Sequence, residues 1–418
     1  MVSIPINALC FAAVLCLLGG AFAQAAPSAE DVNAALGISL FSDDNLWDDP
    51  AEMTAQRLAW PEESKTSTDS SYRKYPSATD RVLGARPYSL ALFGTDGNTS
   101  ALSMMFANKG DSVTSELVAG DDRPSKKQVK SYEAAIKQDE KSISAALTAI
   151  LGNPTTDRFG QGRQTRESVE RWNWNGHAIL LAAPAGEYVA VRILPTDVAD
   201  AQGKSRIPDA ELRARLESRV ERRPNGDVIL KDMPMVNQGP KGYCVPATWE
   251  RVMRYMAIPA DMYVLAMAGD TSAGGGTSVA AIVAGAREAV TRGGRRLDPE
   301  NAKISIRSVA KFIDRGLPIM WTMYSMPDIN ATLNARVAER SGMSDPLLWS
   351  RQLDPVRKAA KKIATDPKQG HMCMIIGYNE KTGEVAISDS WGPQFAERWI
   401  TEEEANAISQ GNLMVINF

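Results

Sequence analysis

A glutamine and a cysteine lie six residues apart where an apolar-periodic segment begins. Gln238 precedes a Gly/Pro-rich turn, and Cys244 follows that turn. A thiol becomes a good nucleophile only when its thiolate is stabilised, and the N-terminus of a helix provides such stabilisation. The Gln238 side-chain amide can donate a hydrogen bond to an oxyanion. The pattern therefore indicates covalent catalysis through a cysteine, which requires a base.

The chain has two histidines that could serve as this base. His371 lies in an apolar, strand-like segment, and Asp389 follows it eighteen residues later. A Cys-His pair oriented by a third polar group is the general arrangement for nucleophilic acyl transfer. His177 has no nearby cysteine and no Asp, Glu or second His at metal-ligand spacing, so we interpret it as structural.

This constellation resembles the papain-like cysteine peptidases, most closely their C39-like branch. The resemblance covers roughly residues 227 to 418 and depends on three segments in the same order. The segments are Gln238 with Cys244, Gly370-His371 ahead of Gly377-Tyr378, and Asp389-Ser390-Trp391-Gly392. It implies an α+β fold in which a helix carrying the cysteine packs on an antiparallel sheet carrying the histidine and the aspartate.

The resemblance also implies the role of each residue. Cys244, His371 and Asp389 would form a catalytic triad, Gln238 would line the oxyanion hole, and Trp391 would shield the His–Asp hydrogen bond. Asp replaces the Asn of papain at this position, as is usual in the C39-like branch. The implied activity is that of a cysteine-type peptidase acting on a peptide or protein substrate, with no cofactor and no metal.

Cys373 leaves an alternative open. It is two residues from His371, so on a strand the two side chains point to the same face. A Cys244–Cys373 disulfide would make the domain a non-catalytic papain-like binding module, whereas a free Cys373 would be a small buried hydrophobe. Within the enzyme class, a papain-like amidase or acyltransferase would use the same residues as a peptidase.

Composition narrows the class of protein. The chain has 418 residues, 44% of them hydrophobic and 23% charged, which suits a soluble protein of two domains. A net charge of -3 gives no reason to expect nucleic acid or an anionic membrane as partner. Residues 9–23 are apolar or small, no charged residue precedes Glu30, and small-x-small sites lie at 21–25, which is typical of a secretory signal peptide over 1–25; the alternative is an uncleaved N-terminal anchor or a buried helix. We therefore expect a secreted or periplasmic protein that does not associate with a membrane after cleavage.

The elements that must position these residues divide the chain further. We expect a polar, partly ordered lead-in over 26–79, a smaller α+β domain of unknown function over 80–200, a helical connector over 201–226 and the catalytic domain over 227–418. The smaller domain should contain a strand pair joined at Asp96-Gly97 and a helix over 125–151. Residues 327–368 are interpreted as a largely helical insertion before the His371 strand. The Gly274–Gly276 run is interpreted as a loop that lines the cleft or as a simple linker. A phosphate-binding loop is the less favoured interpretation.

Overall fold

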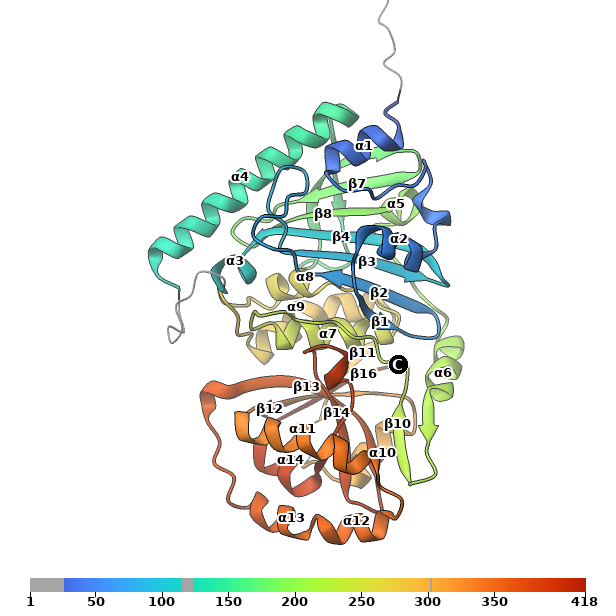
Figure 1. Ribbon diagram of the computed structural model, residues 1–418, viewed down its shortest axis with the longest axis vertical. Helices are drawn as coiled ribbons and strands as arrows, with labels where there is room; N and C mark the ends of the chain where they lie inside the picture. The colour runs from blue at the N-terminus through green and yellow to red at the C-terminus, as the bar shows by residue number, and fades with distance from the viewer. Residues whose placement is uncertain (1–25, 115–123, 301–302) are drawn as a thin grey trace, which may run out of the picture.

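The computed structural model describes residues 26–114, 124–300 and 303–418. The predicted signal peptide over 1–25 lies outside the described residues. The chain forms two antiparallel sheets with helices on their faces, so the expected α+β class is confirmed. Figure 1 shows the first sheet above, the second sheet below, and helices α7 to α9 between them.

The first sheet has the strand order β1-β2-β3-β4-β8-β7-β6-β5. Its strands are β1 Glu62–Lys65, β2 Asp69–Lys74, β3 Ser89–Thr95, β4 Asn98–Asn108, β5 Thr155–Phe159, β6 Glu167–Trp174, β7 His177–Ala182 and β8 Tyr188–Pro195. The helices of this part are α1 Ala29–Leu36, η1 Leu46–Asp48, α2 Ala51–Leu58, α3 Asp111–Thr114, α4 Lys126–Leu151 and α5 Thr196–Asp200.

Two elements predicted in this part are confirmed. Asp96 and Gly97 both have positive φ, as a tight turn between right-twisted strands requires, and they join β3 to β4. Helix α4 starts after Ser125, which caps it by accepting a hydrogen bond from the Gln128 N–H, and it ends at Gly152.

Residues 26–79 differ from the expected partly ordered lead-in. They hold α1, η1, α2, β1 and β2, and they bury Leu36, Leu40 and Leu46 in a core with the first sheet. Strands β1 and β2 have no apolar alternation, which explains why the sequence does not indicate them. They form because β2 pairs with β3 along its whole length.

The second sheet has the strand order β11-β16-β12-β13-β10-β9, with β14 paired to β13 and β15 paired to β14. Its strands are β9 Val220–Arg222, β10 Asp227–Leu230, β11 Arg296–Glu300, β12 Ile319–Tyr324, β13 Gly370–Asn379, β14 Glu384–Ser388, β15 Arg398–Thr401 and β16 Ser409–Asn417. The helices are α6 Asp209–Ser218, α7 Cys244–Tyr255, α8 Met262–Ala268, α9 Val279–Arg292, α10 Ile306–Ile313, α11 Pro327–Ser341, α12 Pro346–Gln352, α13 Asp354–Ala360, η2 Pro367–Gln369, η3 Pro393–Phe395 and α14 Glu402–Ile408.

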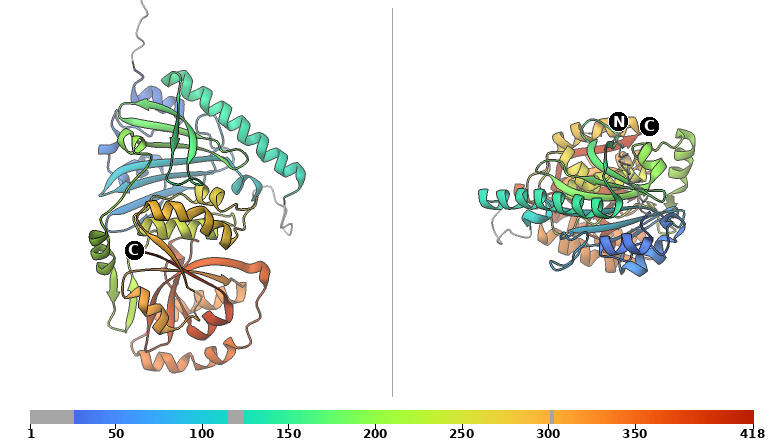
Figure 2. Two further views of the ribbon diagram at one scale, coloured as in Figure 1. Left: turned by 180° about the vertical axis from the view of Figure 1, so that it is seen from behind. Right: turned by 90° about the horizontal axis from the view of Figure 1, so that it is seen from above.

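Helix α7 is buried on every side because it lies between the two sheets. On one side Trp249, Val252 and Met253 pack into the core of the second sheet. On the other side Ala247 and the preceding Tyr243 join a separate cluster with apolar residues of the first sheet and of α8. The view from behind in Figure 2 shows the same layering. The two sheets are therefore joined through shared apolar packing as well as by the connecting chain.

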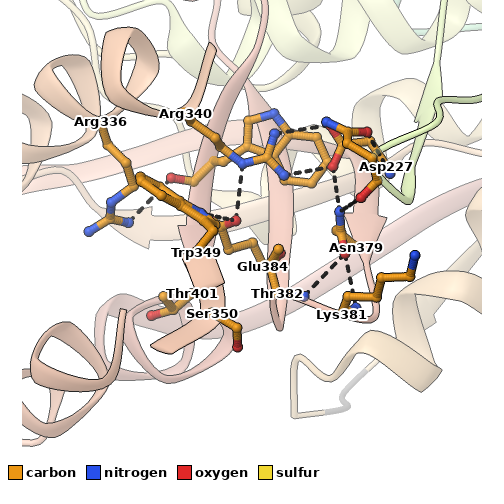
Figure 3. Close-up of polar contacts among 12 residues, drawn as sticks. Asp227, Arg336, Arg340, Trp349, Ser350, Asn379, Lys381, Thr382, Glu384 and Thr401 are labelled. Carbon is orange, nitrogen blue, oxygen red and sulfur yellow. Dashed lines mark hydrogen bonds and ion pairs between the residues drawn. The ribbon is translucent and has the colours of Figure 1, made fainter. Parts of the chain in front are cut away.

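The expected helical insertion is present as α11, α12, α13 and η2. Figure 3 shows how it is fastened: Arg340 of α11 binds Asp227 of β10 through two hydrogen bonds and Glu384 of β14 through a third. Trp349 of α12 donates to the same Glu384 at 3.0 Å. These contacts are buried, so α11 and α12 are fastened to β10 and to β14, the strand that Asp389 follows.

Candidate functional site

Cys244 is the first residue of α7 and is partly exposed. Pro246 fits this first turn because the N–H that proline lacks has no partner within the helix there. Thr248, one turn further on, donates to the Met372 carbonyl at 3.1 Å. This bond ties the helix that carries Cys244 to the strand that carries His371.

His371 is the second residue of β13 and is buried. Its Nε2 lies 2.8 Å from Oδ1 of Asp389, which directly follows β14. The ring stacks on Trp391, with centroids 4.5 Å apart and planes at 28°. Because Nε2 faces the carboxylate, Nδ1 is the nitrogen that remains for the hydrogen bond between His371 and the Cys244 thiol.

Opposing effects set the protonation of this pair. Burial raises the pKa of Cys244, but the hydrogen bond and charge of His371 and the N–H groups of Met372 and Val245 outweigh it, so the pKa is lowered. Burial lowers the pKa of His371, but the hydrogen bonds and charges of Asp389 and Cys244 raise it to about 9. Both directions favour a thiolate next to an imidazolium at neutral pH.

Asp389 is fully buried and has a second partner that the sequence analysis missed. Arg398 of β15 donates from Nη2 to Asp389 Oδ2 at 2.6 Å, and it too is fully buried. Burial raises the pKa of Asp389, but His371 and then Arg398 outweigh it, so the pKa is lowered. No sequence signal marks Arg398, since a single arginine on a strand has many possible partners.

Gln238 lies on the segment that leads into α7. Its N–H donates to the Ser390 carbonyl at 2.9 Å, beside Asp389. Its side-chain Nε2 donates to the Lys241 carbonyl at 2.9 Å. A carboxamide nitrogen carries two hydrogens, so one remains for another acceptor. The structure thus ties Gln238 to both the aspartate turn and the turn before Cys244.

Lys241, in the same turn, is a second residue that sequence analysis missed. Its ammonium group is buried, 3.0 Å from Asp111 of α3, and is surrounded by the rings of Tyr75, Tyr243 and Tyr263. Tyr75 also donates to the Asn237 carbonyl. Tyr75, which directly follows β2, and Asp111, which follows β4, therefore hold the turn between Gln238 and Cys244.

The structure contradicts the disulfide alternative, because Cys244 and Cys373 are both free. Cys373 is fully buried, and its sulfur lies 3.7 Å from the sulfur of Met323. Burial raises the pKa of Cys373 well above its ordinary value, so its thiol is not activated. It is a small hydrophobe of the core.

His177 has the structural role expected of it. It is fully buried, its Nδ1 donates to the Trp174 carbonyl at 3.0 Å, and its Nε2 accepts from the Leu46 N–H at 3.2 Å. Burial lowers its pKa, and both nitrogens are used only if the ring is neutral. His177 thus fixes η1 onto the first sheet.

The Gly274–Gly276 loop lies against the turn that precedes Cys244. Gly275 bridges to Gly242, and a Cβ on Gly275 would stand 2.5 Å from the Gly242 Cα. This close approach explains why Gly275 is a glycine, and all three glycines have a positive φ, so the run needs no bound phosphate to account for it. Within 26–114, 124–300 and 303–418, no group of three or more His, Cys, Asp or Glu residues could hold a metal ion. In the same ranges no helix is both long and apolar enough to cross a bilayer.

Residues 230–410 match the model of the Peptidase_C39 like family. The matched segment contains Gln238, Cys244, His371 and Asp389, together with Arg398. No curated protein matches the chain.

Proposed function

We propose that the chain is a cysteine peptidase with Cys244 as its nucleophile, since residues 230–410 match the model of the Peptidase_C39 like family. One observation carries the proposal: the Cys244 thiol, at the start of α7, is hydrogen-bonded to a histidine whose other nitrogen is 2.8 Å from a buried carboxylate. This is the arrangement that activates a thiol for acyl transfer. The proposed fold of this segment is papain-like, with α7 packed on the sheet that carries His371 and Asp389.

In the proposed reaction, the Cys244 thiolate attacks the carbonyl carbon of the scissile peptide bond. The resulting oxyanion is held by the free N–H of the Gln238 amide and by the Cys244 backbone N–H, which the helix ladder does not use. The His371 imidazolium gives its proton to the leaving amine as the C–N bond breaks, which leaves a thioester. Neutral His371 then takes a proton from water, the hydroxide adds to the thioester, and the acid and the thiolate are released.

The structure supports a distinct role for each supporting residue. Asp389 fixes the His371 ring with Nδ1 towards Cys244 and stabilises the imidazolium. Trp391 covers one face of the same ring, so water has less access to the His–Asp hydrogen bond. We propose a peptide or protein as substrate and a secreted or periplasmic location, the latter because residues 1–25 have the composition of a signal peptide.

Alkylation tests the nucleophile without a known substrate. The wild-type protein would be treated with iodoacetamide at pH 6, and mass spectrometry would follow the modification of Cys244. We expect Cys244 to react much faster than glutathione at this pH, because only a thiolate reacts. Cys373, buried and not activated, serves as the internal control.

Turnover is tested with a fluorogenic protein substrate and the variant Cys244→Ala. We expect a loss of roughly a thousandfold or more with an unchanged circular dichroism spectrum, because the nucleophile alone is removed. A Cys244 that reacts no faster than glutathione, or a Cys244→Ala variant that keeps full turnover, would contradict the proposal. The N-terminal residue of the exported protein, read from the same mass spectra, tests cleavage near residue 25.

A further inference from the structure

The guanidinium of Arg398 binds partners on two different segments, one through each of its terminal nitrogens. Nη2 donates to Asp389 at 2.6 Å, and Nη1 donates to the side-chain oxygens of Asn330 and Asn334 at 3.1 and 3.0 Å. Both asparagines belong to α11, and Arg398 itself is fully buried. One planar cation thus connects the carboxylate beside His371 to the inserted helix.

The Asp389 carboxylate has a different partner on each oxygen. Oδ1 faces His371 Nε2 at 2.8 Å, and Oδ2 faces Arg398 at 2.6 Å. An isolated buried carboxylate is costly and would tend to take up a proton, whereas a paired one stays ionised. Negative and positive charges therefore alternate through successive direct contacts, from the Cys244 thiolate to the His371 imidazolium, the Asp389 carboxylate and the Arg398 guanidinium.

A second buried cation lies on the α7 side of this array. Arg251 donates to the Ser388 hydroxyl at 2.6 Å and to the Pro234 carbonyl at 2.8 Å, and no direct contact between Arg251 and Asp389 is recorded among the described residues. From β13, Cys373 also faces this region but stays a neutral thiol. Arg251 therefore acts on Asp389 only through its charge, whereas Arg398 makes the direct bond.

We propose that Arg398 is a positioning residue that keeps Asp389 ionised and aimed at His371 by occupying the second oxygen of the carboxylate. The inference rests on the proposed function and extends it, because it makes Arg398 of β15, held by α11, responsible for keeping Asp389 ionised. It also gives a physical reason why a carboxylate can stand at this site: a neutral amide would need no cation, but a dry carboxylate does.

Helix α11 is itself held in place by buried ion pairs. Arg340 and Arg336 of the same helix bind Asp227, Glu384 and Glu404 through buried ion pairs (Figure 3). Asn330 is further fixed by donating to the Ser325 hydroxyl at 2.7 Å. The asparagines therefore hold the guanidinium in one orientation, which a lysine ammonium could not match because it has no planar fork.

The test measures the rate of Cys244 alkylation from pH 4 to 10 in the full chain. In Arg398→Gln we expect the acid limb of the profile to move to higher pH by about one unit or more, because the pKa of Asp389 rises when its cation is removed. Protonated Asp389 no longer stabilises the imidazolium, so less thiolate is present. Arg192→Gln is the matched control, since it removes a buried arginine from an ion pair with Glu167 in the first sheet, and this pair does not contact Asp389 or α11.

A double-mutant cycle separates charge pairing from a purely structural role. Asp389→Asn and Arg398→Gln should each slow alkylation at pH 6, and the double variant should react no more slowly than Asp389→Asn alone, because Arg398 acts only through the charge of Asp389. If Arg398→Gln does not fold, Arg398→Lys replaces it and should show a smaller shift of the acid limb.

The possible failures are distinguishable. A wild-type Cys244 that reacts like an ordinary thiol overturns the proposed function itself. An activated wild-type Cys244 whose profile is unchanged in Arg398→Gln, or in Arg398→Lys where that variant is used, overturns only the role of Arg398. Strictly additive losses in the double variant also overturn it.

Discussion

Gln238 is the residue whose proposed contribution can be isolated most cleanly. Gln238 makes no hydrogen bond to Cys244 or His371, and its side-chain amide is oriented by the Lys241 carbonyl. We expect Gln238→Ala to reduce kcat roughly 100- to 1000-fold, because one donor to the oxyanion is lost. The rate of Cys244 alkylation should not change, because that rate depends on the Cys–His pair.

The control for Gln238 is Gln394→Ala, a glutamine exposed on the turn that follows Trp391. It should leave kcat and alkylation as in the wild type. If Gln238→Ala slowed alkylation as much as turnover, Gln238 would be supporting the Cys–His pair and would not be an oxyanion donor.

At the scale of single residues, sequence analysis could select groups whose chemistry is unusual. Cys244, His371 and Asp389 belong to residue types with distinct reactivity, and histidine is rare enough here to limit the choice. Arg398 and Lys241 could not be selected, because arginine and lysine are common and are normally solvated. Only the fold shows that these two are fully buried next to the site.

At the scale of elements, the segment from 231 to 243 owes its shape to the first sheet. The Met235 N–H donates to Ser64, the Asn237 N–H donates to Glu63, and the Lys241 ammonium pairs with Asp111. This long-range support explains why the sequence did not indicate β1: a strand of Glu-Glu-Ser-Lys is formed by its partners and not by its own periodicity. Helices α4 and α7 were predictable because capping and apolar spacing are local signals.

Asp111→Asn tests this support. Lys241 would become a buried cation without a counter-ion, so we expect a loss of about 3–5 kcal/mol in the free energy of unfolding. Burial already lowers the pKa of Lys241, and loss of Asp111 should lower it further. Urea denaturation followed by tryptophan fluorescence would measure the loss.

Glu52→Gln is the matched control, since it breaks the exposed pair between Glu52 and Lys65 and should cost about 0–1 kcal/mol. The double variant Asp111→Asn with Lys241→Met should recover part of the stability, because no unpaired charge remains. Equal losses in Asp111→Asn and Glu52→Gln would show that the buried pair does not anchor the turn.

At the scale of the whole molecule, the N-terminal part supports the C-terminal part. Val236, Tyr243 and Ala247 share one apolar cluster with β4, β6, β7 and β8. Sequence patterns do not show which exposed faces meet, so the sequence alone does not distinguish a permanent support from a removable cover. The shared cluster favours a permanent support over a detachable inhibitor.

Cutting the connector of the folded protein tests which of these two roles is right. The chain folds intact, so the shared cluster has formed before the cut. Residues 204–206 are exposed and lie between α5 and α6, so a specific protease site inserted there should be cleaved in the folded protein. We expect the two pieces to co-elute on gel filtration and Cys244 alkylation to continue at the uncut rate, because the apolar cluster and the Lys241–Asp111 pair remain closed. In mild urea, dissociation of the pieces should stop alkylation at pH 6, since the turn before Cys244 loses its support.

An inhibitory cover would give the reverse result. Cys244 would then react faster once the N-terminal piece is released, and that result would exclude the supporting role.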